Sequence, residues 1–133
     1  MASSTGGTVT RVNRNNGNVQ TPIAVQGGAY GVAFDGTNLW VTNQGAGSIS
    51  KVDIVANTAS NIVLATGPSG IAFDGTNLWI ASQGTGNVYA VNPMNNAVVR
   101  TIAVGGQPSA VVFDGTNIWV TDAAASTVTK LLP

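Results

Sequence analysis

The sequence contains no cysteine and no histidine, and its five acidic residues are all aspartate, so glutamate is absent too. Without cysteine there is no disulfide, no thiolate metal site and no cysteine nucleophile. Without histidine there is no imidazole base to activate a serine or threonine hydroxyl. We therefore predict that the chain is not an enzyme, and we expect neither a metal site nor another cofactor.

Charge is also scarce, because charged residues make up only 8% of the chain, against about 25% in typical globular proteins. Helix surfaces usually carry glutamate and lysine, so this composition argues against helices. The formal net charge of zero gives no electrostatic footprint for nucleic acid or an acidic membrane. No apolar run approaches the roughly 18 residues of a membrane-spanning helix. We expect neither nucleic acid nor a membrane as a partner.

The N-terminus is small and polar over residues 1–7. It has neither the basic region nor the apolar segment of a signal peptide. We expect these residues to be a flexible N-terminal segment or an added linker, as in an excised or engineered fragment of a longer protein. The sequence leaves the cellular location open.

One seven-residue pattern, Phe-Asp-Gly-Thr-Asn-Leu/Ile-Trp, occurs three times: Phe34–Trp40, Phe73–Trp79 and Phe113–Trp119. The copies are spaced by 39 and 40 residues. Asp-Gly between two apolar runs predicts a tight turn joining antiparallel strands. Each repeat of about 40 residues therefore begins with a β-hairpin.

Two further strands follow each of the first two hairpins, and one follows the last. The predicted first strands are Gly31–Phe34, Gly70–Phe73 and Ala110–Phe113, and the second are Leu39–Thr42, Leu78–Ala81 and Ile118–Thr121. The predicted third strands are Ser48–Val52, Asn87–Val91 and Thr127–Leu131, and the fourth are Ile62–Ala65 and Val99–Val104. The first two strands of each repeat are apolar on both faces, which predicts that they lie between two neighbouring layers. Four strands in a period near 40 residues predict an all-β propeller of four-stranded antiparallel blades.

The pattern is out of phase at the two ends. Thr8–Asn13 matches a third strand and Thr21–Val25 a fourth, whereas the last repeat has no fourth strand of its own. The predicted division is a half-blade over 8–25, blades over about 29–65 and 68–104, and a last blade over about 107–133, which together form the repeat region 8–133.

The runs Gly31–Asn43, Gly70–Ser82 and Ala110–Asp122, with Ser48–Asp53, resemble the YVTN and NHL-like β-propeller repeats of bacteria. The resemblance covers nearly all of residues 8–133. It implies a binding or scaffolding module, often from a secreted or cell-surface bacterial protein. One relative of this class is the streptogramin B lyase, whose chemistry needs a histidine base and a divalent metal. This chain has no histidine or glutamate to fill that role.

The repeated tryptophans and aspartates each have two interpretations. Trp40, Trp79 and Trp119 either stack sugars or fill the space between blades, and their mid-strand position favours packing. Asp35, Asp74 and Asp114 either surround a cation or cap their own turns, and their place at the start of each turn favours capping.

Polar residues gather in the loops at the end of the blades opposite the Asp-Gly turns. The candidate ligand-binding residues there are Tyr30, Asn43, Gln44, Ser82, Gln83, Gln107 and Asp122, with Ser69 close by. The glycine-rich segments 45–47 and 84–86 are followed by strands rather than by the helix that a phosphate cradle needs. We keep glycan or peptide binding by this face as the alternative function.

Three blades alone leave two blade faces uncovered, each of roughly 350–400 Å². Two copies joined head to tail would cover four such faces, about 1,500 Å² in total, a standard interface size. We therefore predict a homodimer that closes a six-bladed propeller, with Pro22–Val25 of one chain completing the last blade of the other. A trimer with nine blades remains the other closed arrangement.

Overall fold

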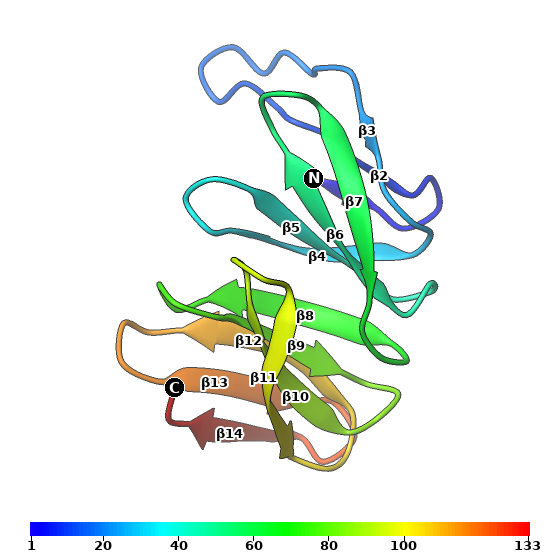
Figure 1. The fold of residues 1–133 in the computed structure, drawn as a ribbon. Helices are drawn as coiled ribbons and strands as arrows, with labels where there is room; N and C mark the ends of the chain where they lie inside the picture. The colour runs from blue at the N-terminus through cyan, green and yellow to red at the C-terminus, as the bar shows by residue number, and fades with distance from the viewer.

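The computed structural model describes residues 1–133 and contains fourteen β-strands and no helix. The strands form four antiparallel sheets that follow one another from the N-terminal end (blue) to the C-terminal end (red) in Figure 1. The strands are β1 (Ala2–Ser3), β2 (Thr8–Val9), β3 (Ile23–Ala24), β4 (Ala29–Phe34), β5 (Leu39–Asn43), β6 (Ser48–Asp53), β7 (Thr58–Val63), β8 (Pro68–Phe73), β9 (Leu78–Ser82), β10 (Asn87–Asn92), β11 (Ala97–Ala103), β12 (Pro108–Phe113), β13 (Ile118–Asp122) and β14 (Thr127–Leu131). With no helix in the molecule, none could span a membrane.

The two middle sheets are four-stranded meanders, β4-β5-β6-β7 and β8-β9-β10-β11. Their inner hairpins are in the same register, because Phe34 pairs with Leu39 just as Phe73 pairs with Leu78. The outer strands begin earlier than predicted: β7 starts at Thr58 rather than Ile62, and β11 at Ala97 rather than Val99. The reason is that Asn57 and Asn96 adopt φ values of 57° and 61°, so each tight turn ends sooner and pairing starts at once.

The last sheet contains only β12, β13 and β14. Its hairpin repeats the same register, with Phe113 opposite Ile118, and β14 pairs with β13 along five residues. No fourth strand lies beyond β14, so the outer edge of this strand is unpaired in the chain.

The N-terminal sheet differs from the sequence-based prediction. Residues 1–7, predicted as a flexible segment or linker, contain β1, which pairs with β2 in the register Ala2 to Val9. A hydrogen bond from the Val25 backbone N–H to the Gly7 carbonyl, at 2.7 Å, joins the turn between β1 and β2 to the chain after β3. The first unit is therefore a three-stranded sheet, β1-β2-β3, rather than two strands after a linker.

Apolar residues between successive sheets form the core, in three clusters, one for each junction. The innermost strands β4, β8 and β12 lie side by side, and glycine allows this approach. A Cβ atom on Gly31 would lie 2.7 Å from the Ser69 carbonyl oxygen, and one on Gly70 would lie 2.5 Å from that of Ser109. The sheets are thus packed most tightly at their inner edges.

Candidate functional site

Each Asp-Gly turn holds the tryptophan that follows it. One carboxylate oxygen of Asp35 accepts the backbone N–H groups of Thr37 and Asn38 at 2.8 and 2.7 Å. The other accepts the indole N–H of Trp40 at 2.6 Å. Asp74 with Trp79 and Asp114 with Trp119 repeat this arrangement, with indole bonds of 2.7 and 2.6 Å. The aspartates thus cap the turns and also fix the orientation of the rings, a second role that the spacing did not suggest.

These bonds favour the charged form of the carboxylates. Burial alone would raise the pKa of Asp35. The N–H groups of Asn38, Trp40 and Thr37 and the charge of Lys51 together lower it by more, so the pKa is below its usual value. The Asn117 backbone N–H and the Trp119 indole hold the pKa of Asp114 far below its usual value. Each carboxylate is thus paired with N–H donors of its own hairpin, and no three acidic side chains lie together where they could hold a metal ion.

Two of the three tryptophans are fully buried between sheets. Trp40 packs in the cluster with Ile71, Leu78 and Ile80 of the next sheet. Trp79 packs in the same way with the last sheet, against Val111, Ile118 and Val120. Neither ring is available to a sugar.

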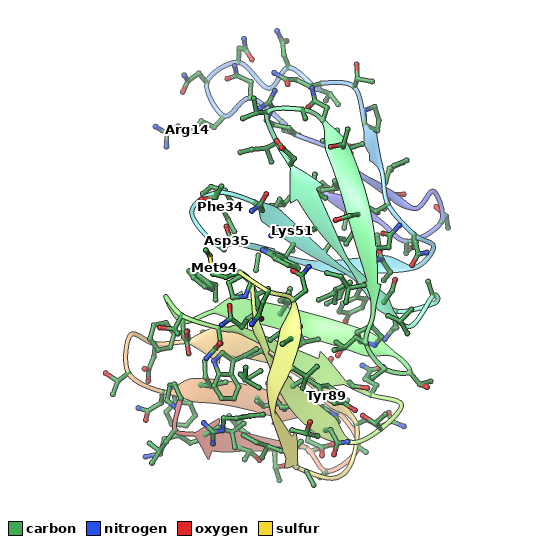
Figure 2. All side chains as sticks on the ribbon, viewed as in Figure 1. Arg14, Phe34, Asp35, Lys51, Tyr89 and Met94 are labelled. Atoms are coloured by element: carbon green, nitrogen blue, oxygen red, sulfur yellow. The ribbon has the colours of Figure 1, made fainter.

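A cation covers each buried ring and reaches the following sheet. The Lys51 ammonium lies 5.2 Å from the centre of the Trp40 ring and donates to the Pro93 carbonyl at 3.0 Å. The Arg100 guanidinium lies 5.4 Å from the Trp79 ring and donates to the Leu132 carbonyl at 3.1 Å. Figure 2 shows Lys51 beside Met94, the neighbour of Pro93, at the junction of two sheets. Aspartate, tryptophan, cation and carbonyl therefore form a unit that joins one blade to the next.

The last sheet repeats the aspartate–tryptophan pair of this unit, with Asp114 and Trp119, but no sheet follows it. Trp119 is 38% exposed, whereas Trp40 and Trp79 have no exposed surface. Its neighbours Val112 and Val128 are 58% and 60% exposed. We call these three residues the C-terminal face.

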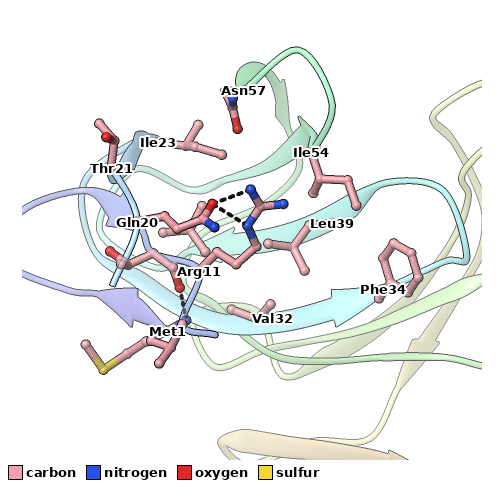
Figure 3. A pocket seen from close by; sticks show the side chains of 13 residues that line it. Met1, Arg11, Gln20, Thr21, Ile23, Val32, Phe34, Leu39, Ile54 and Asn57 are labelled. Carbon is pink, nitrogen blue, oxygen red and sulfur yellow. Dashed lines mark hydrogen bonds between the residues drawn. The ribbon is translucent and has the colours of Figure 1, made fainter. Parts of the chain in front are cut away.

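A cavity lies at the opposite end, between the first two sheets (Figure 3). Its volume is about 420 Å³. The walls are apolar, and Arg11 and Gln20 lie beside them, joined by a hydrogen bond of 2.7 Å from the arginine Nε. We call this cavity the N-terminal hollow; the residues used below to describe it are Val9, Arg11, Val32, Phe34, Leu39 and Ile54.

The loop face carries the sequence-predicted ligand residues, and the structure brings only some of them together. The Gln44 side-chain amide donates to that of Gln83 at 3.0 Å, linking two adjacent blades. Tyr30 and Gln107 are exposed. Asp122 caps its own loop by accepting the N–H groups of Ala124 and Ala125, and it also accepts the N–H of Gln107 from the loop before β12. A groove of about 370 Å³ runs between residues 44–47 and 63–67.

Asn43, Ser82 and Ser69 are buried, so the surface position predicted for them is wrong. Asn43 donates to the hydroxyls of Ser48 and Ser50 at 3.1 and 2.8 Å. Ser82 donates to the Thr66 carbonyl at 2.6 Å. The loops that precede the inner strands fold over the ends of β5 and β9, and this covers polar residues that the sequence places at the rim.

No protein-family model matches the chain, and no curated protein matches it by sequence. Solved structures match it well by fold. Hydrazine synthase of Kuenenia stuttgartiensis aligns with a TM-score of 0.86 and 24% identity, over 97% of this chain and 41% of that one. Virginiamycin B lyase of Staphylococcus aureus aligns with a TM-score of 0.82 and 18% identity, over 98% of this chain and 46% of that one. A chain of the nidogen/laminin complex aligns with a TM-score of 0.81 and 21% identity, over 95% of this chain and 52% of that one.

These neighbours define the class of the fold, a β-propeller of four-stranded blades, and the predicted fold class is confirmed. The chain spans about half or less of the length of each neighbour, as a partial propeller does. The neighbours include a lyase as well as propellers that are not enzymes, so the fold alone assigns no activity.

Proposed function

We propose that this chain is a non-catalytic β-propeller segment that assembles with a second copy of itself into a closed ring of six blades. The observation that carries the proposal is that the two ends of the chain are unpaired and complementary to each other. The C-terminal face presents Trp119 with no sheet to receive it, and the N-terminal hollow lies beside a sheet that no tryptophan covers. Within one chain these ends cannot meet, because two complete sheets separate them (Figure 1).

The strand inventory supports the same assembly. The last sheet has three strands, and its outer strand β14 is free to pair. Strand β3 lies at the fourth-strand position of the first sheet. If β3 of one copy pairs with β14 of the other, each chain contributes three blades and the ring has six.

The carboxylates support a non-catalytic role. All five aspartates accept backbone N–H groups in turns. Asp53 and Asp122 have pKa values below the usual range because backbone N–H groups at Ala56 and Ala125, respectively, bind their charged forms. A general base or acid at neutral pH needs a pKa raised toward 7, which is the opposite shift.

The test is the mass of the purified chain in solution, measured by multi-angle light scattering. A mass of two chains is expected. A mass of one chain at micromolar concentration would overturn the proposal, and a mass of three chains would replace the six-bladed ring by a nine-bladed one.

Glycan or peptide binding at the loop face is a second candidate, favoured by the Gln44–Gln83 pair beside the groove at residues 63–67. Side-chain amides at the edge of a groove can donate to and accept from sugar hydroxyls or a peptide backbone. A glycan and peptide panel tests it. A ligand whose affinity falls at least about tenfold in Gln83→Ala, but not in the remote Thr116→Ala, would support binding. If no glycan or peptide of the panel binds, binding is contradicted and only the structural role remains.

A further inference from the structure

The two ends of the chain carry hairpins of the same form. In β1–β2, Ala2 pairs with Val9 and Ser3 with Thr8. In β13–β14, Thr121 pairs with Val128 and Asp122 with Thr127. The same pairing of second and third strands recurs in the middle sheets, where Ala81 pairs with Val88 and Thr42 with Ile49. Hairpin β1–β2 therefore occupies, beside sheet β4–β7, the place that second and third strands occupy beside every later sheet.

The tryptophan site of this first junction is open. At the last junction Trp79 packs with Val111 and Ile118. The residues at the same repeat positions in β4 and β5 are Val32 and Leu39, and both line the N-terminal hollow. Val32 is 39% exposed, whereas Val111 is 7% exposed. The hollow thus lies where an indole ring packs at the two complete junctions.

A cationic side chain, that of Arg11, also lines the N-terminal hollow. Arg11 follows β2 at the repeat position that Lys51 has in β6. Arg11 lies two residues after Val9, and Lys51 lies two residues after Ile49. Lys51 covers a tryptophan and reaches the Pro93 carbonyl. Arg11 instead binds the Gln20 side chain, and Ile54, at the repeat position of Pro93, lines the hollow beside it (Figure 3).

We propose that the N-terminal hollow receives Trp119 of a second copy, and that hairpin β1–β2 is a placeholder that the second copy's β13–β14 hairpin displaces. This inference rests on the proposed self-assembly and specifies its contact. Strand β3 stays in place and becomes the fourth strand of the incoming blade. Val112 and Val128 would then be covered together with Trp119, as their counterparts Ala72 and Val88 are at the last complete junction.

The placeholder is held less firmly than the hairpin that would replace it. β1 and β2 pair over two residues each, whereas β13 and β14 pair over five. Val9 and Gly7 are the buried residues of the hairpin, and residues 11–20 are all exposed. The incoming hairpin also brings Trp119, already oriented by Asp114. Exchange therefore gains strand pairing and aromatic packing together.

Tryptophan fluorescence gives a direct test, since the chain has three tryptophans and only Trp119 is exposed. Acrylamide should quench one component in a dilute sample, and Trp119→Phe should lack that component. At concentrations where the mass is that of two chains, the quenching constant of the component should fall at least threefold. Unchanged quenching in a two-chain species would overturn this inference and leave self-assembly standing; a one-chain mass throughout would overturn both.

Disulfide trapping tests the contact with Trp119 intact. The natural chain has no cysteine, so a mixture of Val112→Cys and Val32→Cys chains can form only engineered bonds. These positions correspond to Ala72 and Val111, which share a cluster. We expect a mixed disulfide to dominate, and Val99→Cys, on the outer strand β11, to give none with Val32→Cys. Equal yields from both mixtures would contradict the placement.

Hydrogen exchange tests the displacement of the hairpin. On assembly, amides of residues 2–9 should lose protection while those of β14 gain it. Greater protection of residues 2–9 in the two-chain species would show that the hairpin stays in its place, and would overturn the placeholder.

Discussion

Asp74 binds the indole N–H of Trp79 at 2.7 Å while the same carboxylate caps the turn between β8 and β9. The bond fixes a fully buried ring from the end of its own hairpin. Because the ring packs against the next sheet, the turn of one blade also sets the packing of the junction. The sequence repeats this pair three times, and in the last repeat the ring faces outward.

Trp79→Ala should destabilise the chain by roughly 3–5 kcal/mol, because it leaves a cavity in the junction between two sheets. Urea unfolding followed by circular dichroism measures this loss. Val63→Ala, at an exposed position of β7, is the control and should change stability by less than about 0.5 kcal/mol. A loss below about 1 kcal/mol for Trp79→Ala would mean that the ring contributes little to the junction.

Asp74→Ala should cost roughly 1–3 kcal/mol, because it leaves the Trp79 N–H without its partner and removes the turn cap. Asn92→Ala removes a turn cap that accepts no indole N–H, since the Asn92 side chain accepts only the Met94 backbone N–H, at 2.8 Å. Its cost should be smaller. Equal losses for the two variants, measured by the same urea titration, would assign the whole effect to the turn and none to the indole.

Stability should fall as the solution becomes acidic. The pKa values of Asp35, Asp53, Asp114 and Asp122 are lowered in the folded chain, so folding is favoured wherever these groups are charged. Their contribution is complete above the unfolded value of about 3.9 and is lost as pH falls below it through the folded values. Urea midpoints at pH 6, 4 and 2.5 should decrease in that order, and less steeply in Asp35→Asn. A midpoint that stays constant down to pH 2.5 would contradict this.

Gly70→Ala should destabilise the chain by roughly 1–3 kcal/mol, because the new Cβ would lie 2.5 Å from the Ser109 carbonyl oxygen and 2.7 Å from the Ala110 Cα. Gly27→Ala is the matched control, since no atom lies within 4 Å of its Cβ position. Melting temperatures compare the two variants. Equal melting temperatures for both would show that the inner strands can move apart freely.

The sequence predicted the blade from the 39- and 40-residue spacing, because turn chemistry and apolar runs recur together. It missed β1, because Ala2 and Ser3 are small and carry no apolar pattern. A signal was nevertheless present: Gly7 stands where Gly47 and Gly86 stand, and the three have φ values of 55°, 66° and 69°. Counting glycines by repeat position would have extended the first blade to the N-terminus.

The candidate ligand site was less predictable. Spacing places Asn43 and Ser82 at strand ends but does not reveal the loops that cover them. The bond between Asp35 and Trp40 was missed for a related reason, since it joins side chains across a turn whose shape the sequence fixes only in outline. The open tryptophan site at the first junction became visible only when the sheets were placed side by side.

Sedimentation equilibrium on the purified chain, from about 1 to 100 µM, tests the central claim most directly, because dissociation constants of stable dimers fall at or below this range. A ring closed by two copies requires a mass of twice the 13.4 kDa of one chain, with the one-chain species appearing only on dilution. A mass that stays at 13.4 kDa over the whole range would contradict the account.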